Sequence, residues 1–188
     1  MYETLHQIIA AIWILSEVLL NRLVRSSQSD KTRADKQSLR FIWITIMIAL
    51  PLAHILSRQF HVLPISSSPL IVQAGLAMIV AGMIYRFIAI YTLGRFFTVD
   101  VAIRSDHRIV RKGMYRYMRH PSYLGSLLSF LGNGFALNSW VGLLIGFVPV
   151  LLTFLYRMKV EEELLINNFG QEYIDYKKET WRLIPFVY

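Results

Sequence analysis

Apolar residues dominate long stretches of this chain, and polar residues gather in the short segments between them. Five stretches approach the length of about 20 residues that a helix needs to cross a bilayer. They are residues 5–22, 41–57, 69–92, 122–137 and 139–157. The pattern predicts an all-α integral membrane protein with about five transmembrane helices, and a count of four is the alternative.

The five stretches differ in how well they suit a membrane. Glu17 interrupts the first, and Pro51 and His54 in the second predict a kinked or unevenly placed helix. Only Asn138 and Ser139 separate the fourth from the fifth, so these two are expected to form an antiparallel helical hairpin. Five glycines in the third and fourth stretches are expected to permit a close helix approach or an opening. They are Gly75, Gly82, Gly125, Gly132 and Gly134.

The composition agrees with a membrane protein. Of the 188 residues, 55% are hydrophobic and 17% are charged, whereas about a quarter of the residues of a soluble domain are charged. The net charge of +8 by itself fits nucleic acid, an anionic membrane surface or an acidic ligand. The absence of cysteine excludes disulfides, thiolate nucleophiles, cysteine-ligated zinc and iron–sulfur clusters. No metal site is expected.

The basic residues lie mainly in three segments, 21–40, 93–120 and 157–188. Five spans would place all three segments on one side of the membrane, and the positive-inside rule makes that side cytosolic. The opposite loops carry only Arg58, and Arg86 falls inside the third stretch. The charge is therefore mainly a topology signal, and no nucleic acid partner is expected.

The polar material on that side predicts a cytosolic cap, formed by the 93–120 connection and a C-terminal helix that is broken or bent at Gly170. Residues 97–103 have the β-branched character of a short strand. Residues 25–38, rich in Ser, Lys and Asp, are expected to form a linker.

Two polar motifs flank the predicted hairpin. The first opens the fourth stretch and reads RHPSYLG over residues 119–125. Proline suits the first turn of a helix, which is typical of a chain entering a membrane, but the free N–H groups and the dipole of the same helix start also favour a carboxylate. After the fifth stretch, Arg157 and Glu161 are four residues apart and so share one helix face. Ionisable groups at that depth are costly, which indicates a function.

The order and spacing of these motifs resemble the isoprenylcysteine carboxyl methyltransferase family and its phospholipid N-methyltransferase relatives. The resemblance rests on RHPSYLG, on the hairpin, and on a tail with EE at 161–162, Leu165, FG at 169–170, Tyr173, Tyr176 and RLIPF at 182–186. HRIV at 107–110 and GMY at 113–115 match the region before the first motif. The similarity covers residues 75–188 well, and the first two spans match only as hydrophobic helices.

The resemblance implies a methyltransferase that uses S-adenosylmethionine at a cytosol-facing site and acts on a lipophilic acceptor, most directly by carboxyl O-methylation of an isoprenylcysteine-like substrate. It implies one membrane-embedded domain over 1–188, with the first two spans and loops in 1–68 and the catalytic core in 69–188. Arg157 is implied to contact the substrate and to form a catalytic pair with Glu161. The implied cofactor-binding residues are His107, Arg108, Ile109, Val110, Tyr115, His120, Pro121, Ser122, Tyr123, Glu161 and Glu162.

The chemistry fits these residues. Methyl transfer from a sulfonium is an in-line displacement that depends on alignment and a dry site more than on acid–base groups. A carboxylate acceptor is already deprotonated at neutral pH. Arg157 is able to hold it with two hydrogen bonds, while Glu161 is able to pair with the amino group or ribose hydroxyls of the cofactor. The helix start at His120 and Pro121 is expected to receive the cofactor carboxylate.

Other interpretations stay open. An NADPH-dependent membrane reductase related to sterol reductases would have a similar HPxYxG-like element, a small transporter would need polar groups that face one another within the membrane, and a non-catalytic multipass protein would bind no cofactor. The tail after the hairpin favours the methyltransferase. The expected partners are membrane lipid and a lipophilic small molecule or lipidated acceptor, whose methylated group is a carboxylate, hydroxyl, thiol or amine.

Overall fold

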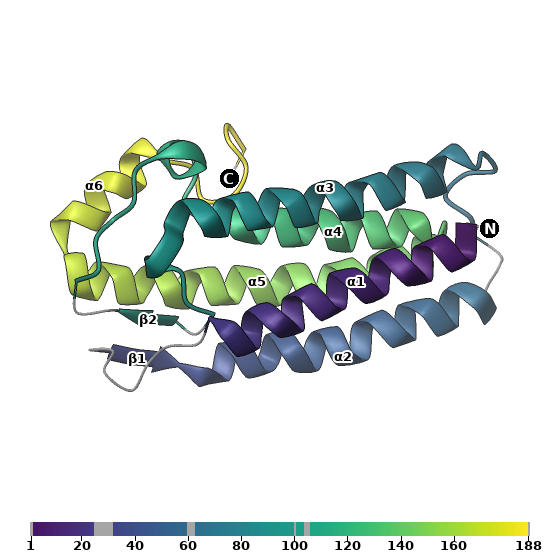
Figure 1. Ribbon diagram of the computed structural model, residues 1–188, viewed down its shortest axis with the longest axis horizontal. Helices are drawn as coiled ribbons and strands as arrows, with labels where there is room; N and C mark the ends of the chain where they lie inside the picture. The colour runs from purple at the N-terminus through teal and green to yellow at the C-terminus, as the bar shows by residue number, and fades with distance from the viewer. Residues whose placement is uncertain (1, 25–31, 60–62, 100, 104–105, 188) are drawn as a thin grey trace.

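Five long helices run side by side along the molecule, and short elements gather at one end of them (Figure 1). The computed structural model describes residues 2–24, 32–59, 63–99, 101–103 and 106–187. The long helices are α1 (Tyr2–Leu23), α2 (Lys36–Gln59), α3 (Leu70–Leu93), α4 (Pro121–Ala136) and α5 (Trp140–Phe169). The short elements are β1 (Thr32–Asp35), the 3-10 helices η1 (Gly94–Phe96) and η2 (Gly113–Arg116), β2 (Val101–Ile103) and α6 (Gln171–Glu179). We call this end of the molecule the cap.

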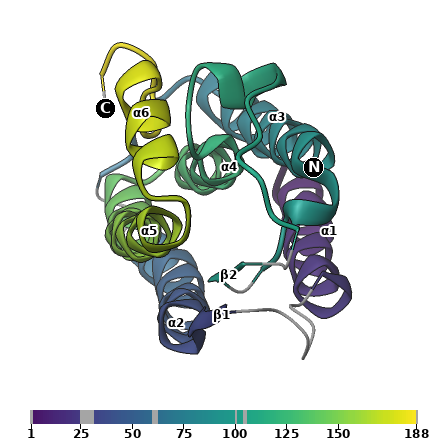
Figure 2. The same ribbon diagram turned by 90° about the vertical axis from the view of Figure 1, so that its left-hand side faces the viewer.

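Within the described residues, four of these helices are long and apolar enough to cross a membrane: α1, α2, α3 and α5. The expected fifth span, α4, has 16 residues. At 1.5 Å per residue it is about 24 Å long, shorter than the bilayer core of about 30 Å. Most of its residues are buried, because α4 packs along α3 on one side and α5 on the other. Figure 2, seen from the cap end, shows these contacts, with α2 beside α5 and α1 beside α3.

Glycines bring the backbones of α3 and α4 into direct contact, as the sequence predicts. A Cβ atom added at Gly82 would lie 2.6 Å from the carbonyl oxygen of Gly125, and one added at Gly132 would lie 2.7 Å from the carbonyl oxygen of Gly75. Such distances leave no room for any side chain. Close backbone contact of this kind is how membrane helices associate without a hydrophobic driving force.

Polar contacts near both ends of α1 attach this helix to the bundle. His6 Nε2 lies 3.0 Å from Asn133 Oδ1 of α4, and Glu17 pairs with Arg86 of α3, whose Nε lies 2.6 Å from the carboxylate. Between them, Trp13 packs edge-on against Phe130 at 4.7 Å. The charge that interrupts the first apolar stretch is thus compensated by a partly buried charge of opposite sign.

The structure of the cap differs from two expectations: that residues 25–38 form a linker, and that the fold is all-α. Residues 32–35 of the predicted linker form β1, which pairs antiparallel with β2, Thr32 opposite Ile103. The fold is therefore all-α apart from one β pair, because the strand predicted near residue 100 needs a partner for its backbone groups. The helix α2 begins at Lys36 and continues through Pro51. Residues 25–31 of the linker lie outside the described residues.

The last helix folds back at Gly170, as predicted. Its φ of 54° lies in the left-handed region, which glycine adopts at little cost. The tail after α6 then returns to the start of α4, where Arg119 N donates to the carbonyl oxygen of Trp181 (2.9 Å) and His120 N to that of Arg182 (3.2 Å). The RHPSYLG motif is thereby held between the bundle and the tail.

The α3–α4 contact gives the first prediction. Gly132→Ala should lower the free energy of unfolding by about 1–3 kcal/mol, because the added methyl overpacks a backbone contact. Gly146→Ala is the matched control, since its Cβ would meet only the Ala53 Cβ at 3.4 Å. Unfolding of the purified protein in detergent measures both. Equal stabilities for the two variants would contradict the packing argument.

Candidate functional site

A cavity of about 830 Å³, counting its opening to solvent, lies between the bundle and the cap. Its wall includes the end of α3, residues 96–98, 103 and 107–110 of the connection after α3, η2, the start of α4, the end of α5 and α6. Ten of the residues expected at a site contribute to this wall. They are His107, Arg108, Ile109, Val110, Tyr115, His120, Ser122, Tyr123, Arg157 and Glu161.

Two of the expected cofactor residues do not line the cavity. Pro121 is the first residue of α4 and is fully buried in the fold. Glu162 follows Glu161 on α5 but faces another direction, because successive residues of a helix point about 100° apart. Its carboxylate is buried against basic side chains of the cap.

A chain of hydrogen bonds connects the two residues predicted to share one face of α5. Arg157 Nε donates to the Tyr123 hydroxyl (3.0 Å), and this hydroxyl donates to Glu161 Oε2 (2.8 Å). Arg157 is only 3% exposed. Its other nitrogens donate to Ser38 Oγ (2.8 Å) and to the carbonyl oxygen of Val99. The guanidinium is therefore positioned by α2, α4 and the connection after α3, while Glu161, with 31% of its side chain exposed, faces the cavity.

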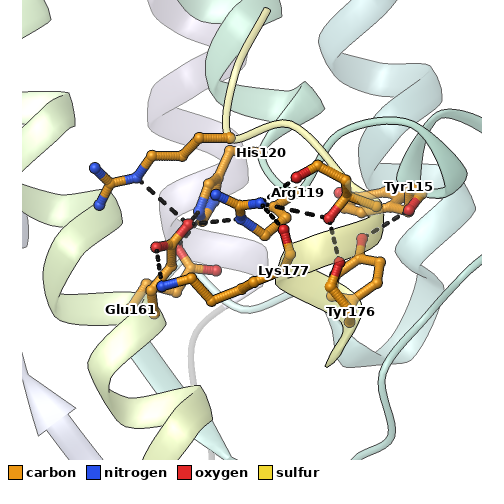
Figure 3. A network of polar contacts seen from close by, with 9 residues as sticks. Tyr115, Arg119, His120, Glu161, Tyr176 and Lys177 are labelled. Atoms are coloured by element: carbon orange, nitrogen blue, oxygen red, sulfur yellow. Dashed lines mark hydrogen bonds and ion pairs between the residues drawn. The ribbon is translucent and has the colours of Figure 1, made fainter. Parts of the chain in front are cut away.

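Glu162 is the centre of an ion-pair cluster behind the cavity wall (Figure 3). Its Oε1 lies 2.9 Å from Arg119 Nε, 3.1 Å from His120 Nε2 and 3.4 Å from Arg182 Nε. Its Oε2 lies 3.2 Å from Lys177 Nζ. Arg119 also donates through Nη1 to the carbonyl oxygen of Lys177 (3.1 Å). The cluster joins the start of α4 to α5, α6 and the tail.

Aromatic rings form one wall of the cavity. The His107 ring lies 5.2 Å from that of Phe96 and 5.7 Å from that of Phe169, and the Arg108 guanidinium lies 5.7 Å from the Phe96 ring centre. Aromatic rings beside a cation suit a planar heteroaromatic ring. Phe96 was not among the expected site residues, and its only sequence signal is its place in an aromatic pair just before the strand.

Tyrosines of η2 and α6 line another part of the wall. The Tyr176 hydroxyl donates to the carbonyl oxygen of Tyr115 (2.7 Å). Burial raises the pKa of Tyr176 to about 12. Burial, with Glu161 nearby, raises the pKa of the Tyr115 phenol further. Both phenols therefore stay protonated at neutral pH and serve as hydrogen-bond donors.

A second cavity, of about 710 Å³, lies within the bundle. Its wall is mainly apolar and comes largely from α1, α2, α4 and α5, with Glu17, Arg86 and Arg157 as charged members. Four residues border both cavities: Phe97, Thr98, Tyr123 and Arg157. The cap cavity, which has the more polar wall of the two, thus meets the second cavity at the Arg157–Tyr123 hydrogen bond. This second cavity was not predicted from the sequence.

The chain is similar to proteins of a known family. A sequence model described as the isoprenylcysteine carboxyl methyltransferase family matches residues 75–167, which run from α3 to the end of α5. The chain belongs to this family. The match includes the RHPSYLG motif, the helical hairpin, Arg157 and Glu161.

Individual relatives agree with the family. The chain is 38% identical over 115 residues to protein-S-isoprenylcysteine O-methyltransferase B of Arabidopsis thaliana, which covers 60% of this chain and 58% of that protein. It is 39% identical over 116 residues to protein-S-isoprenylcysteine O-methyltransferase of Saccharomyces cerevisiae, covering 60% and 48%. The chain therefore spans about half the length of the curated relatives it matches.

A solved structure has a similar fold. The eukaryotic intramembrane Ras methyltransferase, an isoprenylcysteine carboxyl methyltransferase, superposes with a TM-score of 0.61 at 26% identity, over 81% of this chain and 55% of that one. Together with the four long apolar helices, this similarity makes the chain an integral membrane protein.

The ion-pair cluster gives the second prediction. Glu162→Gln removes the carboxylate shared by four basic side chains and should lower the free energy of unfolding by about 3 kcal/mol. Glu163→Gln, whose parent side chain is 61% exposed, should change it by no more than about 0.5 kcal/mol. Thermal unfolding in detergent measures both variants. A Glu162→Gln protein as stable as the wild type would show that the cluster does not hold the cap.

Proposed function

We propose that this protein transfers a methyl group from S-adenosylmethionine to a lipophilic acceptor in the membrane, most directly to the carboxylate of an isoprenylcysteine. The observation that carries the proposal is that two cavities, the more polar one at the cap and the more apolar one within the bundle, meet at Arg157 and Tyr123. A charged cofactor needs polar groups around it, whereas a lipid-bearing acceptor needs apolar ones. The names of the relatives, protein-S-isoprenylcysteine O-methyltransferases, support the same reaction.

The cap cavity is the proposed cofactor site. The aromatic surface of His107 and Phe96 suits the adenine ring, and the Glu161 carboxylate suits the amino group or the ribose hydroxyls. Tyr115 and Ser122 add hydroxyl groups to the wall. S-adenosylmethionine, when bound, supplies an electrophilic methyl group on a sulfonium. The contribution of the protein is to orient this cofactor and to exclude water from it.

The second cavity is the proposed acceptor site. Its apolar wall suits a lipid chain, and the buried Arg157 guanidinium at its border suits the carboxylate that accepts the methyl group. A carboxylate is already ionised at neutral pH, so no base has to remove a proton. Tyr123 keeps Arg157 aligned with Glu161 through its hydroxyl. A hydroxyl, thiol or amine acceptor would make less use of a cation at this position.

The proposed topology has five spans, with α4 as the short fifth one, and a cytosolic cap. Arg95, Arg111 and Lys178 lie in elements of the cap, which carries most of the basic residues that the structure describes. At the other end of the bundle, Arg58 is paired with Glu3. This asymmetry supports a cytosolic cap by the positive-inside rule. Cytosolic S-adenosylmethionine would then reach the cap cavity directly.

The third prediction concerns the cofactor. Glu161→Gln should weaken the binding of S-adenosylhomocysteine about tenfold or more, because it removes a charged hydrogen-bond acceptor from the cavity. Isothermal titration calorimetry of the purified protein measures this binding, with Glu163→Gln as the control. NADPH is titrated in parallel. Binding of NADPH alone would favour the membrane reductase, and binding of neither ligand by a folded sample would favour a non-catalytic protein.

The fourth prediction concerns the acceptor. Arg157→Lys keeps a positive charge but loses the two-pronged contact with a carboxylate, so kcat/KM for a farnesylcysteine analogue should fall about a hundredfold. Transfer of a labelled methyl group measures this. Binding of S-adenosylhomocysteine within about threefold of wild type is the control for folding, since Arg157→Lys leaves Glu161 in place. Normal turnover by this variant would place the acceptor carboxylate elsewhere.

A further inference from the structure

A basic groove lies on the outer side of the Glu162 cluster, away from the cap cavity. Arg119, Lys159, Lys177 and Arg182 contribute its cations, and Glu162 and Glu163 its carboxylates. Arg119 is the one residue that borders both this groove and the cap cavity. Neither the proposed cofactor site nor the proposed acceptor site uses the groove.

The groove retains positive charge after its internal ion pairs are counted. Both oxygens of Glu162 are occupied, Oε1 by Arg119 and Arg182 and Oε2 by Lys177. One carboxylate therefore faces three permanent or nearly permanent cations. Lys177, with 33% of its side chain exposed, lies at the open side of the cluster. Lys159, whose side chain is 70% exposed, also lines the groove, and its Nζ lies 3.9 Å from Glu163 Oε1. An anion with several oxygens would complete this arrangement.

The exposed face of α5 leads from the membrane into the groove. Leu144, Val148 and Leu152 are exposed apolar residues at four-residue intervals on this face, and Lys159 follows Leu152 by seven residues, or two helical turns. In a bilayer an acyl chain would cover the apolar residues. The headgroup at the end of that chain would then lie at the level of Lys159.

The tail supplies an apolar edge beside the same groove. Trp181 lines the groove, and its ring lies 4.5 Å from that of Phe186. Phe186 is 86% exposed and Val187 is 75% exposed. Exposed aromatic residues next to basic ones are typical of the membrane–water interface. The groove therefore lies where phospholipid headgroups are found.

We propose that this groove binds the phosphate group of an anionic phospholipid, with Lys159 and Lys177 as the accessible donors and the exposed face of α5 against an acyl chain. The inference goes beyond methyl transfer and does not depend on it. A bound lipid of this kind would hold α6 and the tail against the membrane surface, and with them the wall of the cap cavity.

The test compares two pairs of lysines by native mass spectrometry of the full chain released from detergent micelles. The probes are phosphatidylglycerol and phosphatidylcholine with identical acyl chains. Wild-type protein should retain phosphatidylglycerol in preference to phosphatidylcholine. Lys159→Gln/Lys177→Gln should weaken this retention about tenfold. Lys112→Gln/Lys178→Gln is the matched control, because both parent side chains are exposed and lie outside the groove, and it should retain phosphatidylglycerol within about twofold of wild type.

Three results would overturn the proposal. Equal retention of both lipids by the wild type would exclude recognition of the headgroup charge. Equal losses in the two double variants would show that overall charge, and not the groove, attracts the lipid. Displacement of phosphatidylglycerol by millimolar inorganic phosphate, but not by chloride at equal ionic strength, would assign the groove to a free phosphate group instead of a lipid.

Discussion

The carboxylate of Glu162 is surrounded by Arg119, His120, Lys177 and Arg182, and the cap depends on this cluster. These side chains come from the start of α4, from α6 and from the tail. Backbone hydrogen bonds from Arg119 to Trp181 and from His120 to Arg182 join the same segments. A buried carboxylate is stable only with such partners. The Glu162 carboxylate and its basic partners close the back of the cap cavity. Glu161, the preceding residue of α5, faces the inside of the cavity.

Two adjacent glutamates thus have different surroundings, and the helix is the reason. Side chains of consecutive residues diverge by about 100°, so one turn of α5 presents Glu162 to the basic cluster and Glu161 to the cavity, while Arg157 lies one turn earlier on the same side as Glu161. The rigid end of α5 therefore positions two proposed functional groups at once. In the proposed reaction this matters because an in-line displacement depends on alignment more than on acid–base chemistry.

Much of the bundle could be predicted from apolar runs, and the cap could not. The predicted stretch 69–92 corresponds to α3 (Leu70–Leu93), and 122–137 corresponds to α4 (Pro121–Ala136). Both were predictable because a helix start with proline and a short polar turn mark their ends. The fifth stretch ended at 157 on apolarity alone, but α5 continues through a polar run to Phe169. Beyond that run, Leu164, Leu165 and Phe169 of α5 pack with Ile103 of the cap. The strand β1 has no alternating pattern of its own and depends on β2, which is distant in sequence. Helix geometry sets the different directions of Glu161 and Glu162, but a run of acidic residues does not reveal the basic partners that Glu162 meets in the fold.

The two cavities also differ in which part of the chain builds them. The cap cavity is lined from Leu93 onward, mostly by residues within the family segment 75–167. The second cavity takes much of its wall from α1 and α2, including Trp13, Ile42 and Trp43, which lie outside that segment. In the proposed reaction the shared segment therefore supplies the cofactor site and Arg157, and the first two helices shape the space for the lipid chain. Exchange of α1 and α2 between relatives would accordingly alter the choice of acceptor more than the use of the cofactor.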